Sequence, residues 1–209
     1  MKCPHCLDSF HEQLERTRVG NGPEGSWFIN HQLCPGCGKS IIILEKASQG
    51  NRTYSVVFPK GTAREPIPGE VDDPTVINDY TKAVLVMDDS PEASAALSRR
   101  CLQHILREKA HTKNRDLADQ IQEVIDSKTL PSAIADNLDA VRVTGNFAAH
   151  PTKSTNTGAI IDVEPHEAEW DLEVLEQLMD FYFVQPAKAQ KRKDAINAKL
   201  VAAGKPPLK

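Results

Sequence analysis

Two pairs of cysteines near the N-terminus constrain the fold of this chain more than any other feature. Cys3-Pro-His-Cys6 and Cys34-Pro-Gly-Cys37 are C-x-x-C motifs, and 27 residues separate them. In a cytosolic chain such paired motifs bind a metal ion and do not form disulfides, because the compartment keeps thiols reduced. The spacing therefore predicts a tetrahedral zinc site with the four thiolates of Cys3, Cys6, Cys34 and Cys37 as ligands.

Four protein ligands leave no open position on the zinc for water, so the pattern indicates a structural and not a catalytic metal. His5, His11 and His31 are alternative ligands, but each is more simply a surface histidine. His5 lies between two ligating cysteines and is expected to point outward. Gly38 follows Cys37 and can adopt the positive φ that turns backbone N–H groups toward the sulfurs.

Short strands are predicted around these motifs. Residues 26–33, 40–46 and 53–59 are rich in β-branched and aromatic side chains, and the second cysteine motif is the turn between the first two segments. This arrangement is a zinc ribbon, whose small core needs the metal to fold. Ribbons bind nucleic acid, bind protein or brace a neighbouring domain, and the sequence leaves these alternatives open.

The rest of the chain divides by composition. Residues 59–73 are rich in Pro and Gly and form a linker between the ribbon, residues 1–58, and a helical segment, residues 74–186. Residues 187–209 form a basic tail. The fold class is thus mainly α, with an N-terminal β zinc ribbon followed by an all-α bundle. Five helices are expected: one from Pro74, one from Pro91 after Asp89 or Ser90, one over 116–126, one from Pro131, and one after Glu164-Pro165 through Tyr182.

The apolar spacing of these helices predicts their buried faces. The second helix carries a stripe that includes Ala93, Ala96 and Leu97, and Cys101 in the same helix is a small core residue and not a reactive thiol. The positions expected to be buried in the bundle are Leu97, Ile105, Ile121, Leu138, Val141 and Leu175.

Charge is distributed unevenly along the chain. The net charge is -4, but residues 188–209 hold seven Lys or Arg and one acid, so the remainder holds 18 basic and 28 acidic side chains. An acidic body argues against indiscriminate nucleic-acid binding, whereas the basic tail suits a nucleic acid or a solvated chain end. The apolar runs 41–44 and 83–87 are too short to cross a bilayer, so a cytoplasmic protein without a membrane partner is expected.

The segment VRVTGNFAAHP, residues 141–151, is the candidate catalytic site. Arg142, Asn146 and His150 recur every four positions and fall within about 80° of one helix face. An arginine binds phosphate, an amide donates and accepts hydrogen bonds, and a histidine exchanges protons near neutral pH. The trio is suited to RNA cleavage without a metal, or to nucleotide binding. The alternative is structural: a histidine that caps a helix end, with an arginine and an asparagine that bond to a neighbouring helix.

The segments CPHC, CPGCG, LSRRCLQ, LDAVRVTGNFAAHP and FYFVQP together resemble a prokaryotic family of uncharacterised domains. These domains occur alone or attached to restriction-endonuclease-type proteins. The helical part further resembles HEPN domains (higher eukaryotes and prokaryotes nucleotide-binding), which are helical bundles of toxin and phage-defence systems. This resemblance implies a homodimer that acts in defence or stress response, with RNA, a nucleotide or a partner protein as its ligand.

Carried over by position, His150 matches the histidine of the HEPN ribonuclease motif and Asn146 matches its polar residue. Arg142 departs from the pattern, because the motif arginine commonly stands next to the polar residue, where this chain has Gly145. Arg100, or its neighbour Arg99, is the alternative source of positive charge. Many HEPN-like domains are inactive, so a non-catalytic adaptor or dimerisation module that binds protein or nucleic acid is the competing interpretation.

Overall fold

A computed structural model describes residues 1–60, 64, 66–149 and 164–208, with the backbone alone for residues 144–149. The chain divides into two compact units, Met1–Pro66 and Ile67–Lys209. Each unit has its own core and is described by itself.

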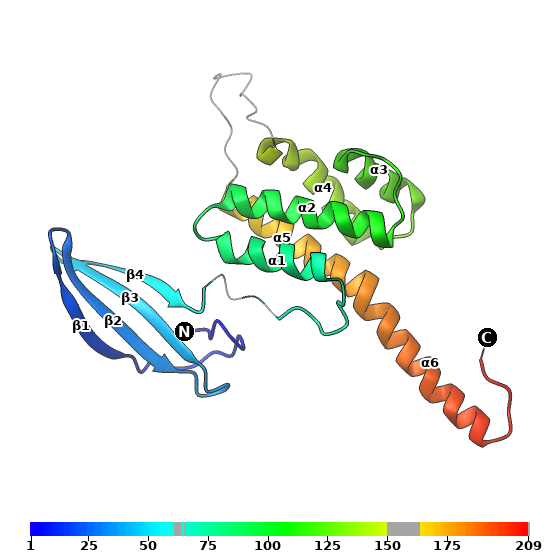
Figure 1. Cartoon of the computed structure of the whole chain (residues 1–209), viewed down its shortest axis with the longest axis horizontal. Coiled ribbons are helices and arrows are strands. Elements are labelled where there is room, and N and C mark those ends of the chain that lie inside the picture. Colours follow the sequence, from blue (N-terminus) through cyan, green and yellow to red (C-terminus); the bar gives the residue numbers. More distant parts are fainter. Residues whose placement is uncertain (61–63, 65, 150–163, 209) are drawn as a thin grey trace. The chain divides into compact units, whose positions relative to one another are not determined.

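The first unit is a four-stranded antiparallel sheet in the order β1-β2-β3-β4 (Figure 1). β2 (Gly25–Leu33), β3 (Ser40–Ser48) and β4 (Asn51–Phe58) confirm the three predicted strands. The second cysteine motif connects β2 to β3, also as predicted. β1 (Glu15–Gly22) was not predicted, because its sequence ERTRVGNG contains three charges and two glycines and lacks an apolar alternation.

The sheet has a mixed interior. Near the cysteines, Ile41 and Ile43 are buried against Cys3 and Cys34. Further along β3, the next buried side chain is the carboxylate of Glu45. The first unit therefore contains one small apolar cluster and one buried charge.

Glu45 is held by donors from three strands. Nε and Nη2 of Arg16 on β1 donate to its two carboxylate oxygens at 2.8 Å each, and Nδ2 of Asn30 on β2 donates at 3.1 Å. Arg52 on β4 adds a longer ion pair at 3.7 Å. The hydrogen bonds from Arg16 hold the pKa of Glu45 down at about 2, so the buried group stays ionised and ties the outer strands to β3.

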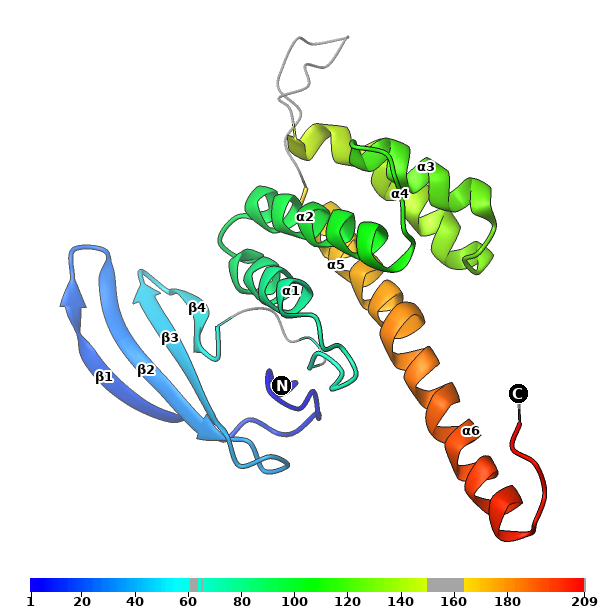
Figure 2. The same ribbon diagram turned by 45° about the vertical axis from the view of Figure 1, so that its right-hand side comes forward.

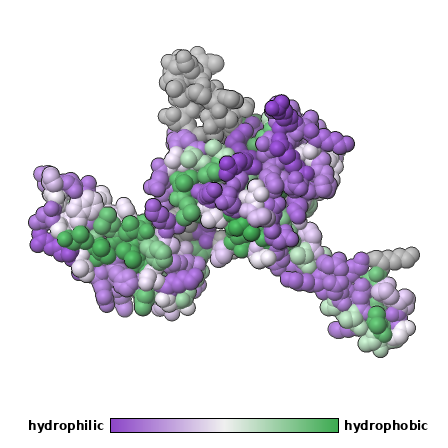
Figure 3. All heavy atoms as spheres, in the orientation of Figure 1, coloured by the Kyte–Doolittle hydropathy of each residue, from purple (hydrophilic) through white to green (hydrophobic). Residues whose placement is uncertain are grey.

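Much of the remaining apolar surface of the sheet is exposed. All eight residues of β4 are exposed, and Figure 3 shows an apolar patch over the sheet. A unit that buries so few of its apolar side chains gains little stability from its core. The exposed members on β2 and β4 are Ile29, Leu33, Tyr54, Val56, Val57 and Phe58.

The second unit is a helical bundle, and each predicted helix is present (Figures 1 and 2). α2 is its centre and contacts α1, α3, α4 and α5. Side-chain caps explain where the first two helices begin: Asp73 accepts hydrogen bonds from the backbone N–H groups of Thr75 and Val76, and Ser90 accepts one from that of Ala93 at 3.2 Å. The helices are α1 (Pro74–Val86), α2 (Pro91–Lys109), α3 (Leu117–Ser127), α4 (Ser132–Ala149), α5 (Pro165–Met179) and α6 (Gln185–Ala202).

Five of the six residues predicted to be buried are buried, and Leu97 is partly buried against the same core. Cys101 is fully buried, as predicted, and burial raises the pKa of its thiol to about 12. The first turns of α2 differ from the prediction. Ala93 and Ala96 are exposed, because α2 turns a small polar face, made of Ser94 and Ser98, toward the bundle.

α5 does not end where the bundle ends. A π-helical turn, η1 (Asp180–Val184), joins it to α6 without a break, and the N–H of Gln185 bonds to the carbonyl of Asp180. The segment from residue 187, expected as a tail, is therefore helical through Ala202. None of the 18 residues of α6 is buried. No helix in the described part of the chain is both long and apolar enough to cross a membrane.

Candidate functional site

The four predicted metal ligands lie together. The sulfur atoms of Cys3, Cys6, Cys34 and Cys37 are all within 4.8 Å of one another, and no other cluster of His, Cys, Asp or Glu in the described residues has this arrangement. The Sγ atoms of Cys3 and Cys37 are 3.9 Å apart, and those of Cys6 and Cys34 are 3.7 Å apart. The cluster is compatible with a metal ion bound by four thiolates.

The two cysteine motifs have the same backbone geometry. Gly38 has φ 69° and donates to the carbonyl of Cys34 at 2.8 Å. Leu7 has φ 65° and donates to the carbonyl of Cys3 at 3.0 Å. The prediction of a left-handed residue after the second motif is confirmed, and the first motif adopts the same turn without a glycine. A left-handed leucine costs about 1–2 kcal/mol, so the sulfur geometry outweighs that strain.

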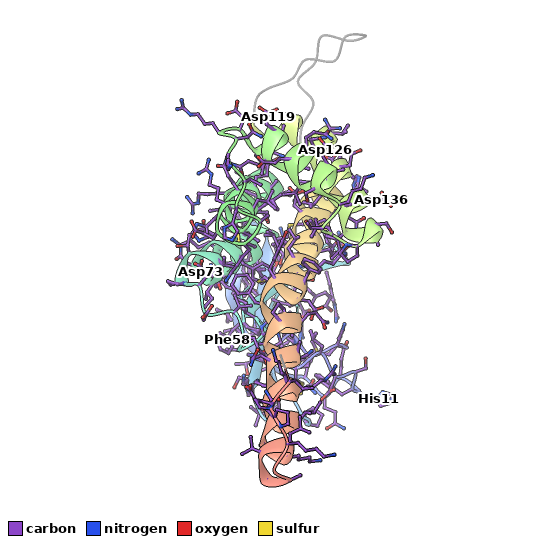
Figure 4. The ribbon with its side chains drawn as sticks, turned by 90° about the vertical axis from the view of Figure 1, so that its right-hand side faces the viewer. His11, Phe58, Asp73, Asp119, Asp126 and Asp136 are labelled. Carbon is purple, nitrogen blue, oxygen red and sulfur yellow. The ribbon has the colours of Figure 1, made fainter. Side chains whose placement is uncertain are left out.

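Neighbouring groups shift the pKa values of the two cysteines of the first motif in opposite directions. The backbone N–H of Asp8 lowers the pKa of Cys6, but burial and the other three thiols raise it to about 12. Burial opposes ionisation of Cys3, but backbone N–H groups of Cys6 and His5 outweigh it and lower the pKa of Cys3 to about 6. His5 does not point outward as expected: its Nε2 lies 2.8 Å from the carbonyl oxygen of Ser40, and its ring packs near Phe58. His11 is exposed and projects from the surface (Figure 4).

The predicted catalytic trio lies on and after α4. Arg142 points back along its own helix, where Nε and Nη2 donate to Asp139 at 2.9 and 2.7 Å. The backbone of Asn146 belongs to α4, which ends at Ala149. The side chain of Asn146 and the whole of His150 lie outside the described residues.

Arg100, the alternative cation, belongs to a different contact. Its Nε and Nη2 donate to the two carboxylate oxygens of Asp79 on α1, each at 2.7 Å. Asp79 is buried, and these hydrogen bonds lower its pKa below the usual range. The pair connects α1 to α2, and its geometry is that of a structural ion pair.

The Arg100→Ala variant is expected to lose thermal stability, because Asp79 would stay buried without its partner. The loss should be on the order of 5 °C or more at pH 7. Since the folded pKa of Asp79 is depressed, its contribution exists above the unfolded pKa and disappears as the pH falls through the folded value. Thermal melts at neutral and acidic pH, with the exposed Arg115→Ala as control, measure this; equal melting at pH 7 would contradict it.

Arg99 is the other alternative to Arg142 as the source of positive charge near Asn146. It extends from α2 to α4, where Nη1 donates to the carbonyl oxygen of Val141 at 3.3 Å. Its side chain is largely buried, which lowers its pKa, and the carboxyl group of Asp171 on α5 counteracts that effect. Arg99 thus places a positive charge between three helices, beside the half of α4 that leads to Asn146.

Asp171 was missed by the sequence analysis. It is 8% exposed, and burial raises its pKa to about 7; Arg99 lowers the value and Glu167 raises it. On α2, the hydroxyls of Ser94 and Ser98 are buried without a hydrogen-bond partner in the described structure. A buried acid with a raised pKa and a partly buried arginine that influences it make this part of the bundle a candidate functional site. The sequence did contain a signal for Asp171, because an aspartate within the apolar stripe of a core helix is expected to be buried.

The chain is a two-unit protein, with a four-cysteine cluster beside the sheet in one unit and a helical bundle in the other. Residues 81–199, more than half of the chain, match the family model described as "Domain of unknown function (DUF4145)". The chain belongs to this family. The matched segment includes Arg99, Asp171 and most of α6, and it leaves out the four cysteines. No curated protein and no solved structure matches the chain.

Proposed function

We propose that this protein is a HEPN-like module of a prokaryotic defence or stress response, and that its helical unit binds and cleaves RNA without a metal. The observation that carries the proposal is the reach of Arg99 from α2 to the carbonyl oxygen of Val141 on α4, with the carboxyl group of Asp171 close enough for the two charges to affect each other's pKa. A fixed cation and an acid with a pKa of about 7 are two of the groups that phosphoryl-transfer chemistry at neutral pH requires. His150, the third, follows α4 in the sequence.

The proposed reaction assigns one role to each group. His150 takes the proton from a ribose 2′-OH, whose oxygen attacks the adjacent phosphorus and forms a 2′,3′-cyclic phosphate. Arg99 stabilises the charge that develops on the non-bridging phosphoryl oxygens. The bond from phosphorus to the 5′-oxygen breaks, and the protonated carboxyl of Asp171 donates its proton to that leaving oxygen.

We propose zinc as the metal of the ribbon. A tetrahedral ion with bonds of about 2.3 Å to four sulfurs places these sulfurs about 3.8 Å apart, close to the separations across the two motifs, 3.9 Å from Cys3 to Cys37 and 3.7 Å from Cys6 to Cys34. All four positions are protein ligands, so the zinc supports the sheet and takes no part in the reaction.

Cleavage of a fluorescent single-stranded RNA tests the proposal. The His150→Ala variant is expected to lose at least about a hundredfold in rate, the usual contribution of a positioned general base, with little change in melting temperature. Wild-type activity should persist in EDTA under conditions that leave the ribbon folded. The exposed His166→Ala serves as the matched control. Equal rates for wild type and His150→Ala would contradict the assignment.

One observation favours a second function, a non-catalytic adaptor. The guanidinium of Arg142 is bound by Asp139, so the predicted trio has no free arginine of its own. If Arg99 acts only as a structural link to α4, the helical unit binds a partner and turns over no substrate. Wild-type protein that binds RNA or protein without cleaving RNA would support the adaptor.

A further inference from the structure

α6 is built as an exposed arm of the helical unit. It continues α5 through η1, none of its residues is buried, and it extends beyond the bundle in Figures 1 and 2. A polar helix of this length is marginal when isolated in water, but the continuous backbone lets the packed α5 nucleate it.

Four of the five cations of α6 are gathered on one side, and the fifth, Lys193, lies outside their arc. At 100° per residue, Lys188, Lys191, Arg192 and Lys199 fall within about 100° of arc and extend along about 16 Å of the helix. All four are exposed. The same arc otherwise holds the small residues Ala195 and Ala202. We call these four cations the basic face.

The opposite side of α6 is occupied by the chain end. The backbone N–H of Leu208 donates to Oδ1 of Asn197 at 2.7 Å, and that of Lys205 donates to the carbonyl of Leu200 at 2.9 Å. Asp194, the acid of this helix, bonds to Gln190 and lies outside the basic face. Among the described residues, Glu70 forms an ion pair with Lys191 at 3.3 Å and also interacts electrostatically with Lys188, while Arg192 and Lys199 have no ion pair there, so the distal half of the basic face is open.

The arrangement of apolar residues argues against a membrane as the partner. A helix that lies on a bilayer needs a continuous apolar face beside its basic one. Ile196, Leu200 and Val201 span about 140° around α6, but Lys193 and Asn197 lie within the same arc, so the apolar residues form no continuous face. Figure 3 shows a largely hydrophilic surface on the part of the arm nearest the bundle.

The charge of the rest of the unit favours an extended anion at α6. Asp119, Asp126 and Asp136 are exposed on α3 and α4, at the end of the unit away from the tip of α6 (Figure 4). The exposed cations Lys113, Arg115 and Lys128 lie among acidic side chains there, whereas the basic face of α6 contains no acid, so a polyanion is attracted more strongly to α6. A row of cations with small residues between them fits a flexible phosphate backbone, whose charges repeat along its length.

We propose that the basic face of α6 binds the phosphate backbone of single-stranded RNA and holds the substrate for the helical unit. This inference rests on the proposed function and names the surface that recruits its substrate. Binding is through charge and is independent of base sequence, so it follows counterion release.

Fluorescence anisotropy with an oligouridine of about 20 nucleotides, in KCl from about 50 to 200 mM, tests this proposal. The variant Lys188→Gln/Arg192→Gln/Lys199→Gln is expected to bind at least tenfold more weakly at low salt. The magnitude of the slope of log K against log salt should fall by about 2, because each of the three lost phosphate contacts contributes about 0.7 to it. The control Lys82→Gln/Lys113→Gln/Lys128→Gln removes the same charge from other exposed positions and should bind like wild type.

Equal weakening in both triple variants would overturn the proposal, because binding would then follow net charge alone. Wild-type binding to vesicles with anionic lipids, with none to RNA, would also overturn it in favour of a membrane surface. A dinucleotide substrate distinguishes binding at α6 from cleavage at the proposed active site. It is too short to span the basic face, so the α6 variant should cleave it at the wild-type rate. Wild-type protein that binds RNA at α6 but cleaves neither substrate would refute the proposed function and leave this inference standing.

Discussion

The Cys34→Ser variant is expected to lose its bound metal and to unfold the sheet of residues 1–58, while α1 to α6 remain folded. Zinc binding to a structural site contributes about 10–16 kcal/mol at pH 7, and a ribbon of this size has no other source of comparable stability. The helical unit has its own large core, so its helices do not depend on the metal. Elemental analysis should find one zinc per wild-type chain, and circular dichroism should show retained helix in the variant.

The chain offers an internal control for this experiment. Cys101 is the fifth cysteine, buried on α2 with its thiol near the carbonyl of Val76. The Cys101→Ser variant should keep the full metal content, even if the helical unit becomes less stable. Wild-type protein purified without chelators and free of zinc would refute the metal assignment.

The Asp171→Asn variant is expected to be more stable than the wild type at pH 8. The folded pKa of Asp171 is raised to about 7, well above that of an unfolded aspartate near 3.8, so the folded state binds a proton that the unfolded state releases. The contribution of Asp171 to the stability of the folded state therefore falls as the pH rises from about 4 to 7 and levels off above that range. A pKa difference of about three units corresponds to an upper limit of about 4 kcal/mol.

Asparagine has the same shape and no charge, so it removes this pH dependence. Denaturant unfolding at pH 5 and pH 8 measures it: wild type and Asp171→Asn should converge at the lower pH. Glu173→Gln, an exposed position on α5, is the control and should leave the pH dependence unchanged. The same Asp171→Asn protein should lose RNA cleavage, because asparagine cannot donate the proton that the leaving oxygen needs. A less stable variant at pH 8 would show that the carboxylate is ionised and paired.

The sequence predicted most of the fold because its strongest signals are local. The C-x-x-C spacing, the prolines at helix starts and the alternation of strands β2 to β4 each lie within a few residues. β1 escaped prediction because it is held by pairing with β2 and by Arg16, whose partner Glu45 is on β3. α6 escaped because no apolar stripe marks it; its helix-forming Ala, Lys and Gln residues, and its continuity with α5, are what form it.

The helical site was only partly predictable for a related reason. The sequence places Asn146 and His150 near each other along one helix, but it cannot show which arginine comes from another helix. Arg99 and Arg100 are adjacent and chemically identical, and α2 directs one toward α4 and the other toward Asp79 on α1. The environment of Asp171 depends likewise on three helices that meet only in the folded bundle.

The π turn between α5 and α6 sets the angle around the helix axis between Asp171 on α5 and the basic face of α6. Such a turn holds an extra residue relative to an α-helix, and each residue of helix turns the chain by about 100°. A chain one residue shorter between Asp180 and Val184 would keep α5 and Asp171 in place. It would present its row of cations to a different side of the molecule. Because η1 joins α5 to α6 without a break, the direction in which the basic face points is set by the same helix that carries Asp171.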